Sequence, residues 1–387
     1  MAILHAFCSF LSIKFFPLLY ALVGFGLLIA VHECGHFVFC KIFNIHTPTF
    51  SIGFGPELFR KKIGKTNFRL ALIPFGGYVE IAGLEETGQG SQDFALAKDE
   101  TSFSQKPYWQ KVCVLSGGVL FNVIFAYLVF CLLFMVGSPK PHSISIAGIM
   151  KESAAEKAGL KTGDGILKIN DKRLQTNNQE LIDDAYEVLL GEIRQNPDKQ
   201  VIFSILRDGK TQEFPVVLGH KEESGKTIGS LGTEMRAPVK KLSFFAAFKA
   251  GAQTTALWIV RMIQGIKQLF CQRSLEGAGG PVMIIAQSFS SAQSGIIPLL
   301  IFLALISLNL ALINILPLGI LDGGKILMIT IEAIIRRELP RAFKNGLEMI
   351  TLFMFISFFL LITYRDIVSL FGAKLKVLYL KIMGALR

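Results

Sequence analysis

Five consecutive residues near the N-terminus carry the side chains best suited to chemistry. His32, Glu33, Cys34, Gly35 and His36 form the pattern H-E-x-x-H. On a helix, two histidines four positions apart project from one face, so both imidazoles can bind one zinc ion while Glu33 lies beside it as a general base. The pattern therefore predicts a metal site that activates water for hydrolysis.

The segment that must position these residues is apolar. Residues 15–31 contain no charged side chain, and this length approaches the roughly 20 residues of a membrane-spanning helix. Ionisable side chains at membrane depth are costly, and where they occur they indicate function. The composition agrees, since 51% of the 387 residues are hydrophobic, 18% are charged and the mean hydropathy is +0.50. We expect a retained membrane helix, because no small-residue cleavage site closes the apolar run.

The basic residues do not indicate a nucleic-acid partner. The formal net charge is +11, but the Lys and Arg residues are scattered among loops, without the basic stripe or interleaved aromatics of a nucleic-acid-binding protein. We assign them to membrane topology and to contact with acidic lipid head groups. The six cysteines form no CxxC pair, so they predict neither a disulfide framework nor a cysteine zinc site.

Four apolar segments qualify as membrane spans, at residues 15–40, 112–139, 296–321 and 349–364. With four spans, the first and third run in the same direction, so His32, His36 and Asp322 reach the same leaflet. Two histidines leave zinc without a third protein ligand, and Asp322, followed by two glycines at the end of an apolar segment, is the predicted third ligand.

Loop charge predicts the side of the membrane on which this site lies. Nine Lys and Arg residues lie between 41 and 111 and five between 325 and 344, whereas only Lys14 precedes the first span. The positive-inside rule then places the metal site at the cytoplasmic side. The basic tail from Arg365 conflicts with this topology; either it lies on the membrane surface as an amphipathic end, or the fourth span is wrong.

Between the second and third spans the composition changes to that of a soluble domain. Residues 144–219 predict a small barrel of short strands with two helices, and residues 158–170 (A-G-L-K-T-G-D-G-I-L-K-I-N) resemble a PDZ domain. Residues 220–295 contain an amphipathic helical pattern, at 244–270, that is too often charged to span a bilayer. It is expected to lie on the outer membrane face or to pack against the PDZ-like domain.

The fold class predicted is a mainly α-helical membrane protein with about four transmembrane helices, a membrane-associated β-hairpin and one inserted α+β PDZ-like domain. The predicted organisation has four parts: an N-terminal membrane region with the zinc motif (1–143), a periplasmic PDZ-like domain (144–219), an amphipathic periplasmic connector (220–295) and a C-terminal membrane region with the third ligand (296–387).

With these motifs in order, the chain resembles the site-2 protease family of intramembrane zinc metalloproteases, closest to the bacterial regulator of sigma-E protease branch. The matching segments are V-H-E-C-G-H-F (31–37), S-I-G-F-G-P (51–56), I-P-F-G-G-Y-V (73–79), Gly280-Pro281 and N-I-L-P-L-G-I-L-D-G-G (314–324). Gly319 stands where the family motif N-x-x-P-x-P-x-x-D-G has its second proline.

The resemblance implies a multi-pass protein of the bacterial inner membrane that uses Zn²⁺ to cleave single-pass membrane proteins. Anti-sigma factors and remnant signal peptides are the implied substrates, with an upstream site-1-type protease removing their outer part first. The alternating residues 67–73, after a turn at 63–66, predict a hairpin whose edge takes substrate as an added strand or merely shields the site.

Four residues are expected to contact the substrate backbone: Asn314, Asn309, Gly76 and Gly77. Polar contact between helices is the competing role for both asparagines, and more so for Asn309. Asn122, in the second span, is interpreted as structural.

Two further functions compete with proteolysis. A non-catalytic PDZ-containing membrane adaptor would have no need of Glu33 beside both histidines. A zinc carrier would need polar residues across the bilayer, whereas the candidate ligands meet at one leaflet.

Overall fold

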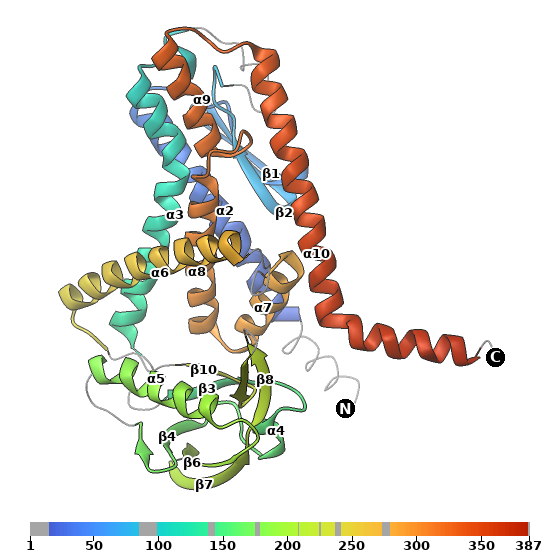
Figure 1. The fold of residues 1–387 in the computed structure, drawn as a ribbon. Helices are drawn as coiled ribbons and strands as arrows, with labels where there is room; N and C mark the ends of the chain where they lie inside the picture. Colours follow the sequence, from blue (N-terminus) through green and yellow to red (C-terminus); the bar gives the residue numbers. More distant parts are fainter. Residues whose placement is uncertain are drawn as a thin grey trace, which may run out of the picture. The chain divides into compact units, whose positions relative to one another are not determined.

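The structure is a computed structural model (Figure 1), and it describes residues 15–84, 99–137, 144–174, 179–207, 209–223, 226–236, 241–272 and 279–385. The chain forms two compact units. The helical unit comprises Met1–Val129 and Gln253–Arg387, and the sheet unit is Phe130–Ala252. Two long helices, α3 and α6, contribute residues to both.

Helices dominate the larger unit. They are α2 (Phe16–Ile42), α3 (Tyr108–Val136), α6 (Phe244–Gln272), α7 (Pro281–Gln293), α8 (Ile296–Asn314), α9 (Asp322–Ile335) and α10 (Arg341–Ala385), with a 3-10 turn, η2 (Phe103–Gln105), before α3. Four segments are long and apolar enough to cross a membrane: Phe16–Ile42, Tyr108–Val136, Ile296–Asn314 and Arg341–Val368. The four predicted spans are therefore confirmed as membrane-length helices. At most 39% of each apolar window is buried, which leaves most of this apolar surface available to lipid.

The third span is shorter than the sequence predicted. Its helix, α8, ends at Asn314 rather than at residue 321. Pro317 has no N–H to donate and disfavours helical geometry at Leu316, so the helix cannot continue. The chain turns through residues 315–321 and restarts as α9 at Asp322.

The predicted connector 220–295 contains several elements, α6 and α7 among them. Its last part, α7, packs against α2, α8 and α10 within the helical unit. The carboxylate of Asp366 on α10 accepts hydrogen bonds from the backbone N–H groups of Gly280 at 3.1 Å and Met283 at 2.9 Å. A negative charge at a helix N-terminus is favourable, so Asp366 joins α10 to the start of α7. No local sequence pattern reveals this contact, because Gly280 and Asp366 lie 86 residues apart.

The predicted hairpin is present as β1 (Thr49–Ile63) and β2 (Thr66–Val79). Both strands bend, so their pairing produces four neighbouring segments in the order 59–63, 66–70, 49–52 and 77–79. Phe50 and Phe68 pack edge-on against Phe37 of α2, with ring centroids 5.4 and 5.6 Å from it. This aromatic contact fixes the hairpin to the helix that carries H-E-x-x-H.

The sheet unit contains a six-stranded sheet with the order β10-β3-β4-β6-β7, in which β5 pairs with β4. Its strands are β3 (Ile144–Ile149), β4 (Gly165–Ile169), β5 (Lys172–Arg173), β6 (Gln200–Arg207), β7 (Lys210–Val217) and β10 (Thr233–Arg236). A separate ladder joins β8 (Gly219–Glu223) to β9 (Lys226–Ser230), and the helices are α4 (Ala154–Lys157) and α5 (Gln179–Gln195).

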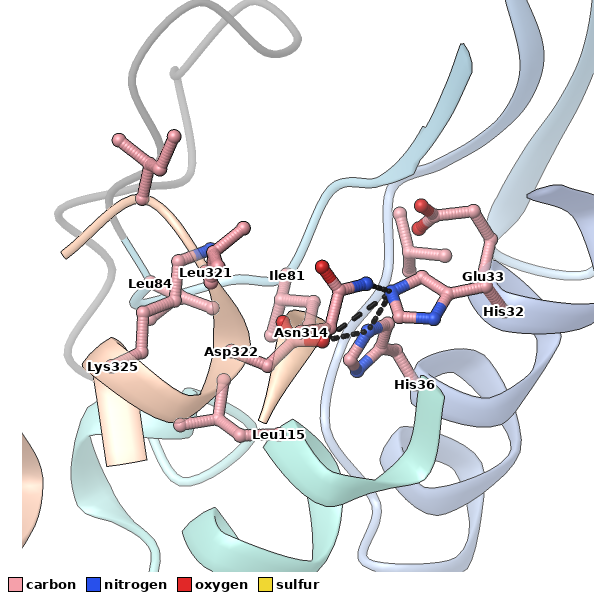
Figure 2. A pocket seen from close by; sticks show the side chains of 12 residues that line it. His32, Glu33, His36, Ile81, Leu84, Leu115, Asn314, Leu321, Asp322 and Lys325 are labelled. Atoms are coloured by element: carbon pink, nitrogen blue, oxygen red, sulfur yellow. Dashed lines mark hydrogen bonds and ion pairs between the residues drawn. The ribbon is translucent and has the colours of Figure 1, made fainter. Parts of the chain in front are cut away.

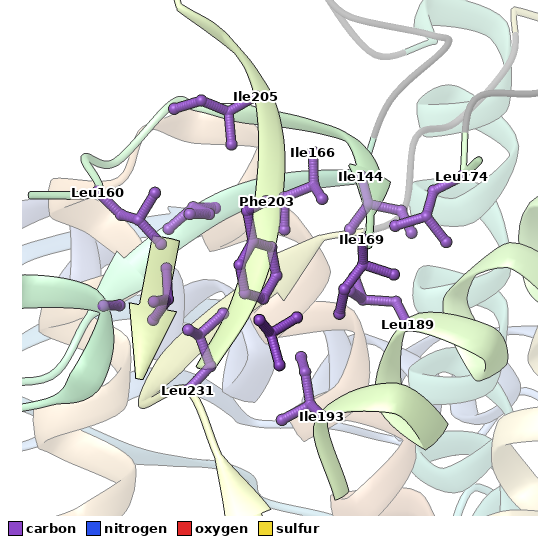
Figure 3. Packing of buried hydrophobic residues seen from close by; sticks show 14 of the residues in the cluster. Ile144, Leu160, Ile166, Ile169, Leu174, Leu189, Ile193, Phe203, Ile205 and Leu231 are labelled. Carbon is purple, nitrogen blue, oxygen red and sulfur yellow. The ribbon is translucent and has the colours of Figure 1, made fainter. Parts of the chain in front are cut away.

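Alternating apolar residues form the core of this unit (Figure 3). Phe203 and Ile205 of β6 meet Ile166 of β4, and Leu189 and Ile193 of α5 pack against them. The sheet extends past residue 219, where the sequence placed the end of the domain, because β10 pairs antiparallel with β3. Short strands beyond a polar hairpin leave little apolar periodicity to read.

Candidate metal centre

The end of α2 and the start of α9 meet in the helical unit. Figure 2 shows His32, His36 and Asp322 directed toward one another. The Nε2 atoms of the two histidines lie 3.3 Å apart, and Oδ2 of Asp322 lies 3.3 Å from Nε2 of His32 and 3.6 Å from Nε2 of His36. His36 and Asp322, which lie 286 positions apart in the chain, thus converge on one point.

The donor set of this cluster fits zinc. One ligand atom from each of the three side chains lies within 4.8 Å of the others. Asp322 is 9% exposed, and within the described part of the chain its Oδ2 accepts no hydrogen bond of good geometry. Convergent acceptor atoms repel one another unless a cation lies between them. Two imidazoles and one carboxylate also leave the open fourth position of a catalytic zinc site.

The charge state of Asp322 suits a ligand. Burial would raise the pKa of its carboxyl group, but the neighbouring His36 and His32 side chains outweigh this effect and hold the pKa below its usual range. The carboxylate is therefore ionised at neutral pH, the form that binds a metal.

Two glycines after Asp322 hold it in place. A Cβ atom at Gly323 would collide with the carbonyl of Ile315, and one at Gly324 would collide with the carbonyl of Leu318. Because glycine has no Cβ atom, the first turn of α9 can lie directly against the 315–321 turn. This close packing returns Asp322 to the level of Asn314, where α8 ends. Gly319, the departure from the family motif, lies against the backbone of α10, with its Cβ position 3.1 Å from the carbonyl oxygen of Leu347.

A cavity of about 130 Å³ adjoins the cluster. Its lining includes His32, Glu33, His36, Val79, Ile81, Leu84, Leu115, Asn314, Ile320, Leu321, Asp322 and Lys325. Glu33 therefore lines the same space as the three candidate ligands. Nδ2 of Asn314 lies 3.4 Å from Nε2 of His32. The cavity has room for several water molecules or a short stretch of peptide.

Not all predicted substrate contacts reach this cavity. Asn309 is half-buried on α8, more than one turn before Asn314, and is absent from the cavity lining among the described residues. Gly77 lies against the helix that carries the base, since a Cβ there would come 3.4 Å from Cγ of Glu33. Gly76 has a φ of +137° and packs against the ring of Phe54, so it shapes the bend in β2.

One face of α3 completes the surroundings of the cluster, through Val114, Gly118 and Asn122 at intervals of four residues. The carbonyl of Val114 lies 2.8 Å from Nδ1 of His36, and the amide of Asn122 lies 3.2 Å from Nδ1 of His32. The sequence interpretation favoured a structural role for Asn122. The four-residue spacing between Gly118 and Asn122 could have predicted that both lie on one face of the helix.

Gly118 leaves the space that the two histidines occupy. A Cβ there would lie 2.5 Å from both Cε1 of His32 and Nε2 of His36. We expect Gly118→Ala to displace both imidazoles, weaken zinc binding by about 10- to 100-fold, as loss of an outer-shell partner does, and cost about 1–3 kcal/mol of stability through overpacking. Zinc competition titration and thermal unfolding of the purified variant measure both effects.

Gly26→Ala is the matched control, since no described atom lies within 4 Å of its Cβ position on α2. It should change neither zinc affinity nor unfolding. Unaltered zinc binding in Gly118→Ala would show that the close approach of Gly118 to the two imidazoles is not needed for zinc binding.

Comparison with known proteins agrees with the site. The model of the family described as "Peptidase family M50" matches residues 20–358. A protein of Clostridium perfringens, named a zinc metalloprotease, is 30% identical over 355 residues, covering 91% of this chain and 98% of its own. The regulator of sigma-W protease RasP of Bacillus subtilis is 26% identical over 424 residues, covering 90% of this chain and 98% of its own. A PDZ-domain structure from Listeria monocytogenes matches 24% of the chain with a TM-score of 0.20 and 13% identity, which supports no statement about the fold.

Membrane-length helices that converge on two imidazoles, a carboxylate and a neighbouring glutamate define the class as a membrane-embedded metallopeptidase. The chain belongs to peptidase family M50, the site-2 protease family. The resemblance inferred from the sequence motifs is thereby confirmed.

Proposed function

We propose that this zinc metalloprotease cleaves single-pass membrane proteins within or beside the bilayer. Zinc is held by His32, His36 and Asp322, and Glu33 is the general base. The observation that carries the proposal is the convergence of the three ligand atoms within 4.8 Å at the end of a membrane-length helix, beside a cavity that Glu33 also lines.

The chemistry divides between the metal and the side chains. When bound, zinc supplies a Lewis acid that polarises the substrate carbonyl and lowers the pKa of water toward about 7. Glu33 takes a proton from the attacking water as the oxygen–carbon bond forms. It then returns the proton to the leaving amine as the carbon–nitrogen bond breaks. Asn314, 3.4 Å from His32, is placed to hold the substrate backbone at the metal.

A helical substrate must be unwound before it can react, because its peptide bonds are held in its own hydrogen bonds. Among the described residues, the segment 77–79 is an edge of the hairpin sheet, paired on one side with residues 50–52. Gly77 of this segment lies beside Glu33. Val79 at the end of the segment, and Ile81 just after it, line the cavity. An extended substrate segment added to this edge would reach the site with its backbone satisfied. This position supports substrate binding by Gly77 more directly than a shielding role for the hairpin, and Gly76 shapes the bend that leads into this edge.

The hairpin also suits contact with lipid. Its exposed large apolar residues are Phe54, Leu58, Phe59, Ile63, Leu70, Leu72 and Ile73. Arg69 is paired with Glu57 at 2.6 Å, which reduces the cost of placing either charge near the bilayer.

For the orientation, loop charge supports the site near the cytoplasmic side of a bacterial inner membrane and the sheet unit in the periplasm. The sheet unit is proposed to be a PDZ-like domain that restricts access by substrates with bulky outer domains. In an otherwise cysteine-free chain, Lys210→Cys should react with a membrane-impermeant reagent applied from the periplasm. Reaction only from the cytoplasmic side would contradict the orientation.

Cleavage by the reconstituted protein tests the function. Two single-pass substrates should share one apolar segment, one with a short outer tail and the other with a folded outer domain. We expect cleavage of the first substrate only, at a bond within or beside the apolar segment, identified by mass spectrometry of the fragments. Cuts confined to soluble regions would contradict intramembrane cleavage.

Replacing residues 144–236 with a short linker separates the gating role from catalysis. The altered protein should cleave both substrates, with cleavage of the short-tailed one confirming that it folds. Continued rejection of the bulky substrate would show that the sheet unit is not the gate. Activity on membrane segments would also rule out a non-catalytic adaptor, and the absence of zinc flux would rule out a carrier.

A further inference from the structure

The two histidines of the metal centre each use one ring nitrogen toward Asp322 and the other toward α3. His36 directs its Nε2 to Asp322 and its Nδ1 to the carbonyl of Val114, 2.8 Å away. His32 directs its Nε2 to Asp322 and its Nδ1 to the side-chain amide of Asn122, 3.2 Å away. The same helix thus serves both imidazoles.

We propose that Asn122 is a positioning residue that fixes His32 in the tautomer and orientation able to bind the metal. The inference rests on the proposed zinc site. A neutral imidazole that gives its Nε2 lone pair to a metal carries its proton on Nδ1, and that N–H needs an acceptor. For His36 the acceptor is a backbone carbonyl. For His32 it is Oδ1 of Asn122.

The Asn122 amide can present either its oxygen or its nitrogen to His32. As placed, Nδ2 faces His32, and Oδ1 is buried without a hydrogen bond from any described residue. Oxygen and nitrogen of an amide exchange on a half-turn about the Cβ–Cγ bond, and the choice between them follows from the network. Metal binding through Nε2 of His32 selects the orientation in which Oδ1 accepts from Nδ1–H.

Asn122 is held firmly enough to orient an imidazole. It is fully buried, and its backbone carbonyl accepts a hydrogen bond from the hydroxyl of Ser307 on α8 at 2.9 Å. Gly118, one turn earlier on α3, keeps the intervening space clear for the ring. A buried amide in a membrane-length helix is costly unless its polar atoms are used, so contact with His32 explains its position better than packing does.

Three variants of the full-length protein test this role. Asn122→Asp keeps an acceptor at the Oδ1 position, Asn122→Leu removes it with little change in volume, and Ser307→Ala removes only the hydrogen bond to the backbone of Asn122. Zinc affinity is measured by competition with a chromophoric chelator, and thermal unfolding is measured on the zinc-free proteins.

We expect Asn122→Leu to bind zinc about 10- to 100-fold more weakly, as loss of an outer-shell partner does. Asn122→Asp should retain the affinity of the unchanged protein or exceed it, because a carboxylate accepts more strongly than an amide. Ser307→Ala should lower the unfolding temperature and weaken zinc binding by less than Asn122→Leu does, because the Asn122 side chain and its acceptor oxygen remain. Rescue by the carboxylate but not by the isosteric apolar residue is a pattern that a packing role would not produce.

Equal zinc affinity in Asn122→Leu and the unchanged protein would overturn the inference while leaving the metal site intact. Equal losses in Asn122→Asp and Asn122→Leu would also overturn it, since they would mean that donation by Nδ2 matters. Failure of the unchanged protein to bind zinc would remove the proposed site itself.

Discussion

A Glu33→Gln protein is expected to bind zinc as tightly as the unchanged protein and to cleave a transmembrane substrate about 10²- to 10⁴-fold more slowly. Glutamine has nearly the same shape as glutamate and can line the same cavity, but it cannot accept the proton of the attacking water. Glu33 lines the cavity from the position next to His32 and is not itself in the ligand cluster. The loss should therefore appear in turnover and not in metal content.

Zinc content by elemental analysis and cleavage by gel assay, on the same purified sample in detergent, separate these two effects. Glu348→Gln is a suitable control, because it changes another glutamate of the helical unit, on α10, outside the lining of this cavity. Robust turnover by Glu33→Gln would refute the proposed base.

Replacement of Asp322 by alanine should have the opposite signature. Because Asp322 supplies the one carboxylate among the described ligand atoms of the cluster, its loss should weaken zinc binding more than the about 10- to 100-fold caused by losing an outer-shell partner. Cleavage should fall with the metal, and excess zinc should restore part of it. His36→Ala should behave in the same way. The dissociation constant for zinc, obtained by chelator competition, measures the effect.

Asp366→Asn is the matched control for a buried aspartate. Asp366 is 2% exposed and caps α7, away from the ligand cluster, and asparagine can still accept a hydrogen bond from a helix N-terminus. It should bind zinc normally. Zinc affinity and cleavage unchanged in Asp322→Ala would remove Asp322 from the site.

Much of this site could be predicted because its chemically important residues form short sequence motifs. The interval between His32 and His36 fixes their common face on any helix. Asp322 was linked to them across the chain by span parity and by the need for a third ligand, and the structure brings the three side chains together. The apolar spans could also be predicted, since an uncharged apolar run long enough to cross the bilayer is typical of a membrane-spanning helix.

The rest depends on contacts between distant segments. The amide of Asn122 and the space left by Gly118 become meaningful only when α3 lies against α2, where Gly35 and Gly117 allow the two backbones to approach closely. The early end of α8 depends on Pro317, whose effect on the backbone is local. The turn that follows brings Asp322 back to the site, and this depends on contacts with distant segments. The cap that Asp366 provides for α7 joins segments that no periodicity relates.

X-ray absorption at the zinc edge of the purified protein identifies the atoms bound to zinc. If His32, His36 and Asp322 hold the metal, we expect a first shell of nitrogen and oxygen only, at about 2.0–2.2 Å, with the outer-shell scattering of two imidazoles. Asp322→Ala should alter that first shell, whereas Glu33→Gln should leave it unchanged. A sulfur scatterer at about 2.3 Å would contradict this ligand set, because it would make a cysteine a ligand.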